Sequence, residues 1–257
     1  MPRLPLYALG LLLCLPCFAQ ERALPQPRSG FEFLGADVKA MQQDDFSNPG
    51  MFWVERGAKL WSEPAGGAGR SCQSCHGAAA NSMKGVAARY PSIDAKTGRL
   101  MTLEQRILNC RTEGQQVSPP AYESEALLSL ATYVAHQSRG MPIAVSIDGP
   151  ARAHFESGRK LFFTRFGQMN LSCAQCHDQN WNRRLFAGPV TQGQPNGYPG
   201  YRLEWQTLGS LERRLRACLS GIRADMFRYG APEHADLELY LAWRARGLTI
   251  EVPGVRR

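Results

Sequence analysis

The sequence contains Cys72-Gln73-Ser74-Cys75-His76 and Cys173-Ala174-Gln175-Cys176-His177, two copies of the pattern Cys-x-x-Cys-His. This pattern is the attachment signature of c-type haem. Two thiols at this spacing can add to the two vinyl groups of one porphyrin, and the adjacent His can then ligate the iron. A redox dithiol or half of a zinc site also uses Cys-x-x-Cys, but neither needs a His directly after the second Cys. We therefore predict two covalently bound haem c groups, attached through Cys72, Cys75, Cys173 and Cys176 and ligated by His76 and His177.

The sequence around the two motifs is an internal repeat, which predicts a duplicated domain. The offset is 101 residues near the motifs, 108 near the later cysteines, and 107 towards the ends of the two halves. The aligned pairs include Glu55 with Glu156, Gly57 with Gly158, Leu103 with Leu211, Glu104 with Glu212, Cys110 with Cys218, and Tyr133 with Tyr240. We predict one cytochrome c-like domain over residues 20–145 and a second, containing the active site, over residues 146–257.

Both halves are expected to contain the same helices in the same order. The hydrophobic periodicity predicts a helix before each haem motif, a helix carrying a cysteine, and a final amphipathic helix. These helices span residues 51–62, 103–111 and 124–138 in the first half, and 151–164, 211–219 and 232–246 in the second. No stretch alternates with period two for long enough to predict a strand. The predicted fold class is mainly α, with two tandem domains that each resemble a class I cytochrome c, whose first and last helices cross beside the haem.

The composition indicates a globular, exported protein. The 257 residues are 44% apolar and 20% charged, unlike a disordered chain. The formal charge is +8, but no run of Lys and Arg reaches five residues, so no nucleic-acid-binding tail is expected. Arg3, the apolar run Leu9 to Phe18 and the cleavage-site pattern ending at Ala19 predict a signal peptide over residues 1–19 and a periplasmic protein. The apolar run is shorter than the ~20 residues of a membrane span, so none is predicted; a buried N-terminal helix is the alternative to a signal peptide.

Export leaves six cysteines, of which Cys110 and Cys218 lie outside the haem motifs. A sixth iron ligand should recur at equivalent places in both halves, and no Met or His outside the motifs does so. Cys110 and Cys218 do recur, so both are candidate thiolate ligands of iron. A disulfide between them is the alternative, because secreted proteins commonly pair their cysteines. Thiolate ligation stabilises ferric iron, which suits chemistry on sulfur better than simple electron carriage.

The helix around Cys218 is more basic than the helix around Cys110. The residues before Cys218 are Arg213-Arg214-Leu215-Arg216-Ala217, whereas those before Cys110 carry one Arg. Arg214 lies four residues before Cys218 and therefore on the same helical face. Guanidinium groups bind oxyanions, and nearby positive charge favours the nucleophilic thiolate. We predict Cys218 and Arg214 as catalytic residues acting on a small sulfur anion; a solvated basic face or a haem-propionate contact is the alternative.

The chain resembles the SoxA family, the haem-containing catalytic subunits of SoxAX cytochrome complexes. The resemblance runs from Arg28-Ser29-Gly30-Phe31-Glu32-Phe33 through both haem motifs to Gly209-Ser210-Leu211-Glu212-Arg213-Arg214 and Cys218. It implies an L-cysteine S-thiosulfotransferase that couples thiosulfate to a cysteine of the SoxYZ carrier protein and passes electrons to haem. It also implies a monohaem SoxX partner, Cys110 and Cys218 as distal iron ligands, and a persulfide at Cys218.

Two other classes of function remain open at the level of sequence. A dihaem electron-transfer cytochrome would use Arg213, Arg214 and Arg216 only to dock an acidic partner. A dihaem peroxidase would need an iron with an open or displaceable coordination position.

Overall fold

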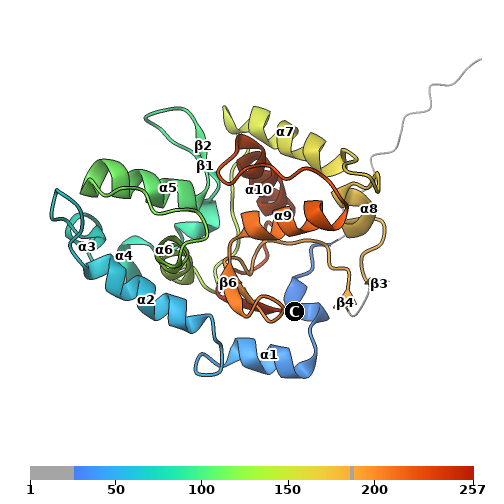
Figure 1. Cartoon of the computed structure of the whole chain (residues 1–257), viewed down its shortest axis with the longest axis horizontal. Coiled ribbons are helices and arrows are strands. Elements are labelled where there is room, and N and C mark those ends of the chain that lie inside the picture. Colours follow the sequence, from blue (N-terminus) through green and yellow to red (C-terminus); the bar gives the residue numbers. More distant parts are fainter. Residues whose placement is uncertain (1–25, 186–187) are drawn as a thin grey trace, which may run out of the picture.

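The computed structural model describes residues 26–185 and 188–257, so the predicted signal peptide lies outside the described residues. We call residues 26–145 the first half and residues 146–257 the second half. Figure 1 shows most helices of the first half on one side of the molecule and those of the second half on the other. None of the described helices has the length and apolarity needed to cross a membrane.

Helices dominate both halves, which confirms the helix-rich fold class. The first half contains η1 (Gly30–Phe33), α1 (Ala36–Gln43), α2 (Met51–Ser62), α3 (Cys72–His76), α4 (Ala79–Ser82), η2 (Ala87–Arg89), α5 (Leu103–Asn109), the π-helical turn η3 (Cys110–Gly114) and α6 (Glu125–His136). The second half contains α7 (Ala151–Phe163), α8 (Cys173–His177), α9 (Leu211–Gly221) and α10 (Pro232–Arg244).

In the first half, α2 crosses α6 at a glycine. Val54, Gly57 and Trp61 are buried, and their spacing places them on one face of α2. A Cβ atom on Gly57 would lie 2.2 Å from the backbone oxygen of Ser129 in α6, so only glycine permits this approach. The rings of Trp61 and Tyr133 meet beside the crossing with their centroids 6.0 Å apart. This is the predicted contact between first and last helices.

In the second half, α7 crosses α10 at the equivalent glycine. A Cβ atom on Gly158 would lie 2.0 Å from the backbone oxygen of Asp236. Phe162 takes the place of Trp61, and its ring centroid lies 5.2 Å from that of Tyr240. The predicted crossing is therefore present in both halves.

Reciprocal backbone hydrogen bonds join the two halves. The amide of Ile143 donates to the carbonyl of Leu248 over 2.9 Å, and the amide of Ile250 donates to the carbonyl of Met141 over 2.9 Å. A shift of 107 residues converts the first of these bonds into the second. Buried apolar side chains from both halves form one continuous core around this junction.

The N-terminal segment packs on the second half, where α1 lies beside the C-terminus of the chain (Figure 1). The amide of Val255 donates to the side-chain oxygen of Gln42 in α1 over 2.9 Å. The side chain of Asn48 donates to the carbonyl of Pro253 over 2.9 Å. The C-terminal segment therefore packs against α1 and Asn48 of the first half. The domain boundaries at residues 20–145 and 146–257 stay a prediction.

The prediction that the chain has no strands is wrong for several short segments. The described strands are β1 (Ser92–Ile93), β2 (Leu100–Met101), β3 (Arg184–Leu185), β4 (Gly188–Pro189), β5 (Gly200–Arg202), β6 (Thr207–Gly209) and β7 (Gly254–Arg256). β1 pairs with β2, β3 pairs with β4, and β5 lies between β6 and β7. Segments of two or three residues carry no usable period-two signal, so the sequence pattern does not reveal them.

Candidate active site

The first haem motif forms α3 on the wall of a cavity of about 590 Å³. Ser71 caps this short helix by accepting a hydrogen bond from the Ser74 amide over 3.0 Å. The cavity is lined by all four residues predicted for the first haem, namely Cys72, Cys75, His76 and Cys110. Most of the remaining wall is apolar, and the volume lies in the range of pockets that hold cofactors. The structure therefore brings the first predicted donor set together.

Cys110 lies in an irregular part of its helix, where the prediction of a helix over residues 103–111 is partly wrong. α5 ends at Asn109, and Cys110 begins the π-helical turn η3. π-helical turns are rare and often occur at functional sites. Desolvation raises the pKa of the Cys110 thiol, although the charge of Arg106 opposes this shift.

The second haem motif forms α8, and its histidine is held by a loop. Ser172 and Gln175 cap the helix reciprocally through side chain and backbone. Nδ1 of His177 lies 2.7 Å from the carbonyl oxygen of Thr191, so this nitrogen carries the proton and donates it. Nε2 is therefore the ring nitrogen that could ligate a metal. A Cβ atom on Gly193 would lie 3.0 Å from Nδ1, so glycine lets the loop approach the ring.

Cys218 of α9 lies beside His177. Burial opposes ionisation of the Cys218 thiol, but the hydrogen bond to His177 and the charge of Arg214 outweigh it and lower the pKa to about 7. Arg214 is the arginine predicted from the helical spacing, and the thiolate in turn raises the pKa of its guanidinium against the effect of burial. Cys218 therefore has the stabilised thiolate character that a reactive cysteine or an iron ligand needs.

The other two arginines of α9 have partners inside the protein. The guanidinium of Arg213 stacks on Trp205 with a carbon-to-centroid distance of 4.3 Å. That of Arg216 stacks on Tyr229 at 4.4 Å. These contacts argue against a solvated basic face, because two of its three predicted cations are engaged within the chain.

Sequence reasoning missed Arg202 on β5 as a member of this site. Its positive charge also favours the thiolate of Cys218. The side chain is 10% exposed and lies 2.8 Å from a carboxylate oxygen of Glu204. No spacing rule connects residue 202 to Cys218, because the loops around β5 and β6 bring them together.

All six described cysteines are free thiols, so Cys110 and Cys218 are not bridged. Cys110 lies with Cys72 and Cys75, whereas Cys218 lies with Cys173 and Cys176. The alternative of a disulfide between Cys110 and Cys218 is therefore wrong for this structure.

Buried arginines beside both motifs fit a haem with its two propionate groups. The side chain of Arg244 is 3% exposed, and one nitrogen lies 2.6 Å from Asp178. Within the described chain, its Nε and Nη1 atoms are buried without hydrogen-bond partners. Nε of Arg111, at the cavity of the first motif, is likewise buried without a described partner. An anionic group would satisfy these donors, so the residues present fit haem c.

Comparison with known proteins assigns the family. A family model described as SoxA/TsdA, cytochrome c domain, matches residues 56–143. The chain is 41% identical over 229 residues to the L-cysteine S-thiosulfotransferase subunit SoxA of Rhodovulum sulfidophilum, covering 89% of this chain and 80% of that relative. This chain belongs to the SoxA family.

A second SoxA relative and a solved structure agree with this assignment. The SoxA subunit of Pseudaminobacter salicylatoxidans is 40% identical over 230 residues, with 89% of this chain and 80% of the relative covered. The crystal structure of SoxXA from P. pantotrophus matches with a TM-score of 0.87 and 37% identity, covering 90% of this chain and 87% of that chain. The SoxA-family chain therefore has a cytochrome c-like fold, and its cytochrome c domain implies covalently bound haem c.

The two motifs of this SoxA-family chain are not equally organised. His177 has a carbonyl acceptor for its Nδ1 proton, whereas no hydrogen bond to His76 is found among the described residues. His76 instead lies against Trp61, with ring centroids 5.8 Å apart. Cys218 also has a cationic neighbour that lowers its pKa, and the pKa of Cys110 is raised. The second motif is therefore the better candidate for the reactive centre.

Proposed function

We propose that this chain is the catalytic haem subunit that couples thiosulfate oxidatively to a cysteine of the SoxYZ carrier protein. The observation that supports this most strongly is the cluster of Cys218, His177 and Arg214, in which a stabilised thiolate lies beside a metal-ligating imidazole and an anion-binding guanidinium. In the overall reaction, the carrier thiol and thiosulfate lose two electrons and one proton. The new bond joins the carrier sulfur to the sulfane sulfur of thiosulfate.

The residues of the second site have distinct roles in this proposal. Arg214 holds the oxyanion end of thiosulfate through its guanidinium fork. The sulfur of Cys218 bonds to the sulfane sulfur with loss of two electrons, and the carrier thiolate then attacks that sulfane sulfur and releases the Cys218 thiolate by exchange. When bound, haem c accepts electrons one at a time. Thr191 keeps His177 in the tautomer that presents Nε2 to the iron.

We further propose two haem c groups. The first is held by Cys72, Cys75, His76 and Cys110, and the second by Cys173, Cys176, His177 and Cys218. The first set is supported by its cavity, and the second by the contact between Cys218 and His177. The resemblance to SoxA implies a persulfide on Cys218, and in that form the outer sulfur of the persulfide takes the part of the Cys218 sulfur in both steps.

The arrangement of the two halves is proposed to reflect a tandem duplication into two class I cytochrome c-like domains. The helix crossings at Gly57 and Gly158 support it, as do the reciprocal hydrogen bonds at the junction. The matched SoxXA structure supports a SoxX partner, and the sequence of residues 1–19 supports export to the periplasm with cleavage after Ala19.

Replacing Cys218 with alanine tests the proposed chemistry. We expect coupling of thiosulfate to the carrier cysteine to fall by about 10³-fold or more, the scale seen when a covalent nucleophile is removed. The measurement is the mass of the carrier protein after turnover by the purified holo-complex. The intact mass of the variant should still show two haems, and the spectrum of the first haem should be unchanged.

The same variant separates the competing functions. If the Cys218→Ala variant still couples thiosulfate to the carrier cysteine, the proposed role of Cys218 is wrong. An electron-transfer cytochrome would then describe this chain better. Turnover of hydrogen peroxide by the unmodified holo-complex would instead favour a peroxidase. The internal contacts of Arg213 and Arg216 already disfavour a role for that helix face in docking an acidic partner.

A further inference from the structure

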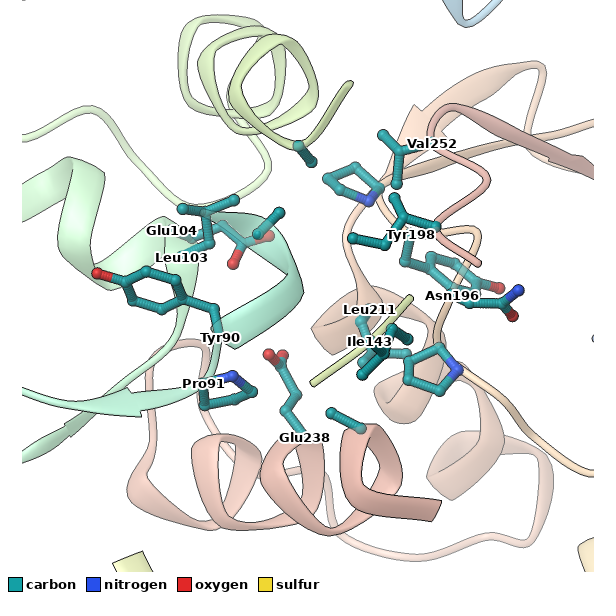
Figure 2. A pocket seen from close by; sticks show the side chains of 16 residues that line it. Tyr90, Pro91, Leu103, Glu104, Ile143, Asn196, Tyr198, Leu211, Glu238 and Val252 are labelled. Atoms are coloured by element: carbon teal, nitrogen blue, oxygen red, sulfur yellow. The ribbon is translucent and has the colours of Figure 1, made fainter. Parts of the chain in front are cut away.

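A small cavity lies at the junction between the two halves, and no residue of either haem motif lines it (Figure 2). Tyr90 and Leu103 separate it from the cavity of the first motif, because they line both. Its volume is about 90 Å³, enough for a few water molecules. We call it the junction cavity. Its wall contains residues that correspond between the halves at offsets of 107 or 108: Ala87 and Pro195, Tyr90 and Tyr198, Pro91 and Pro199, Leu103 and Leu211, Ala135 and Ala242, Ile143 and Ile250. Nothing in the proposed thiosulfate chemistry uses it.

Glu238 has no acidic counterpart in the first half. Its equivalent in the first half, at an offset of 107, is Ala131. Glu238 is 8% exposed, and no hydrogen bond to its carboxyl group is found among the described residues. Figure 2 shows the carboxyl groups of Glu238 and Glu104 entering the cavity from opposite walls. An unpaired carboxylate in such a place is far more costly than a neutral carboxylic acid.

The charges around Glu238 do not compensate for ionisation. The groups that face this region are Glu104 from α5, Glu212, Arg213 and Arg216 from α9, Tyr122 and Glu123 from the loop before α6, and Tyr90 and Tyr198 from the cavity wall. Arg213 and Arg216 stack on aromatic rings, and Arg213 also lies 3.9 Å from Glu123. The described chain contains no cluster of His, Cys, Asp and Glu suited to a metal ion.

We propose that the junction cavity is a proton-binding site, in which Glu238 is a neutral carboxylic acid and the Glu104–Glu238 pair holds at least one proton at neutral pH. Burial raises the pKa of Glu238 well above its usual range, and the charge of Glu104 adds to this effect. Burial likewise raises the pKa of Glu212 to about 7, against the hydrogen bond from the Gly230 amide. Geometry and electrostatics therefore agree on a protonated cluster.

The proton stabilises the contact between the halves. Glu104 and Glu212 lie in the first turns of α5 and α9, the helices that lead to Cys110 and Cys218. Loss of the proton would place a charge on Glu238 of α10 beside the carboxyl groups of Glu104 on α5 and Glu212 on α9, and would weaken the junction. The site thus links ambient pH to the packing that positions both cysteine-bearing helices.

The sign of the pH dependence follows from the raised pKa of Glu238. An unfolded Glu releases its proton near pH ~4.3, whereas folded Glu238 keeps it to higher pH. The free energy of unfolding should therefore fall as the pH rises above ~4.3, until the pKa of the folded state is passed. Glu238→Gln keeps a neutral side chain of similar size, so this contribution should vanish in the variant.

The test is urea unfolding of the holo-protein across a pH series, with wild type, Glu238→Gln and the control Glu55→Gln. Glu55 lies exposed on α2, and its change should leave the pH dependence intact. Between the two pKa values, the unfolding equilibrium constant of wild type should rise up to about tenfold more per pH unit than that of Glu238→Gln. Parallel pH profiles for wild type and Glu238→Gln would overturn the proposal.

Infrared spectroscopy provides a readout that does not depend on the stability of a variant. Wild type at pH 7 should show the carbonyl band of a protonated carboxylic acid, and Glu238→Gln or Glu104→Gln should lose or shift it. Absence of this band in wild type would contradict the site outright. Stabilisation of wild type, but not of Glu238→Gln, by Na⁺, K⁺ or Ca²⁺ at neutral pH would assign the cavity to a cation instead. Neither experiment uses thiosulfate turnover.

Discussion

Arg214 and Cys218 show how one helical turn can define a reactive pair. They lie four residues apart on α9, so their side chains share a face, and the guanidinium charge helps to lower the thiol pKa to about 7. Cys110 has no arginine at the matching distance except Arg106, which forms an ion pair with Asp94. Desolvation raises the pKa of the Cys110 thiol, and the charge of Arg106 offsets only part of this shift. The two cysteines differ first in the hydrogen bond to His177, which Cys218 makes and which has no counterpart among the groups that shift the pKa of Cys110, and then in the charges of Arg214 and Arg202 beside Cys218.

Arg214→Met should lower kcat/KM for thiosulfate coupling by about 10- to 150-fold, because a charged hydrogen-bonding group contributes roughly 1.5–3 kcal/mol. Arg214→Lys should recover part of this loss, since it restores the charge but not the planar fork. Steady-state kinetics of the holo-complex measures both effects. Arg213→Met is the matched control, because Arg213 stacks on Trp205. Equal losses for Arg213→Met and Arg214→Met would contradict a specific role for Arg214.

The helix pairs are the elements that set the shape of each half. α2 with α6 and α7 with α10 approach so closely that a glycine backbone touches the carbonyl of the partner helix. The carbonyl oxygen belongs to a rigid helix and cannot move as a flexible side chain would. The glycines therefore determine how near the helices lie, and the aromatic residues beside them fill the space at the crossing.

Gly57→Ala and Gly158→Ala should each destabilise the protein by about 1–3 kcal/mol, through overpacking at the crossing. For a chain of this size that corresponds to a fall in Tm of roughly 2–12 °C. Differential scanning calorimetry of the holo-protein would measure it. Gly221→Ala is the control, because a Cβ atom at this exposed helix end meets no atom within 4 Å. A shift for Gly221→Ala as large as for the crossing variants would refute the explanation.

At the scale of the whole molecule, the two halves share one core and the chain ends meet. Core side chains from both halves are contiguous around the junction. β7 at the C-terminus pairs with β5 and contacts α1 from the start of the described chain. Stability of either half therefore depends on segments that are distant in sequence.

Val255→Ala should lower the free energy of unfolding of the whole chain by about 2 kcal/mol, from lost burial and an unfilled cavity. Val255 is 0% exposed in β7, where its amide also binds Gln42. Urea unfolding followed separately through the spectra of the two proposed haems should show both signals shifting together. Val117→Ala, at a half-buried loop position, should shift them less. A shift confined to one haem signal would show that the halves unfold independently.

The sequence alone determined the haem motifs, the approximate spans of the six predicted helices, the crossing glycines and the pairing of Cys218 with Arg214, because each depends on spacing within a single helix or short segment. Only the tertiary structure decided that Arg202 lies near Cys218 and that Cys110 begins a π-helical turn. It also decided that Glu238 faces Glu104, and that Arg111 and Arg244 have nitrogens beside the motifs with no hydrogen-bond partner in the described part of the chain. Those features arise where loops or separate halves meet. Local periodicity carries no information about which distant groups share a desolvated space, and that shared space sets their charge and reactivity.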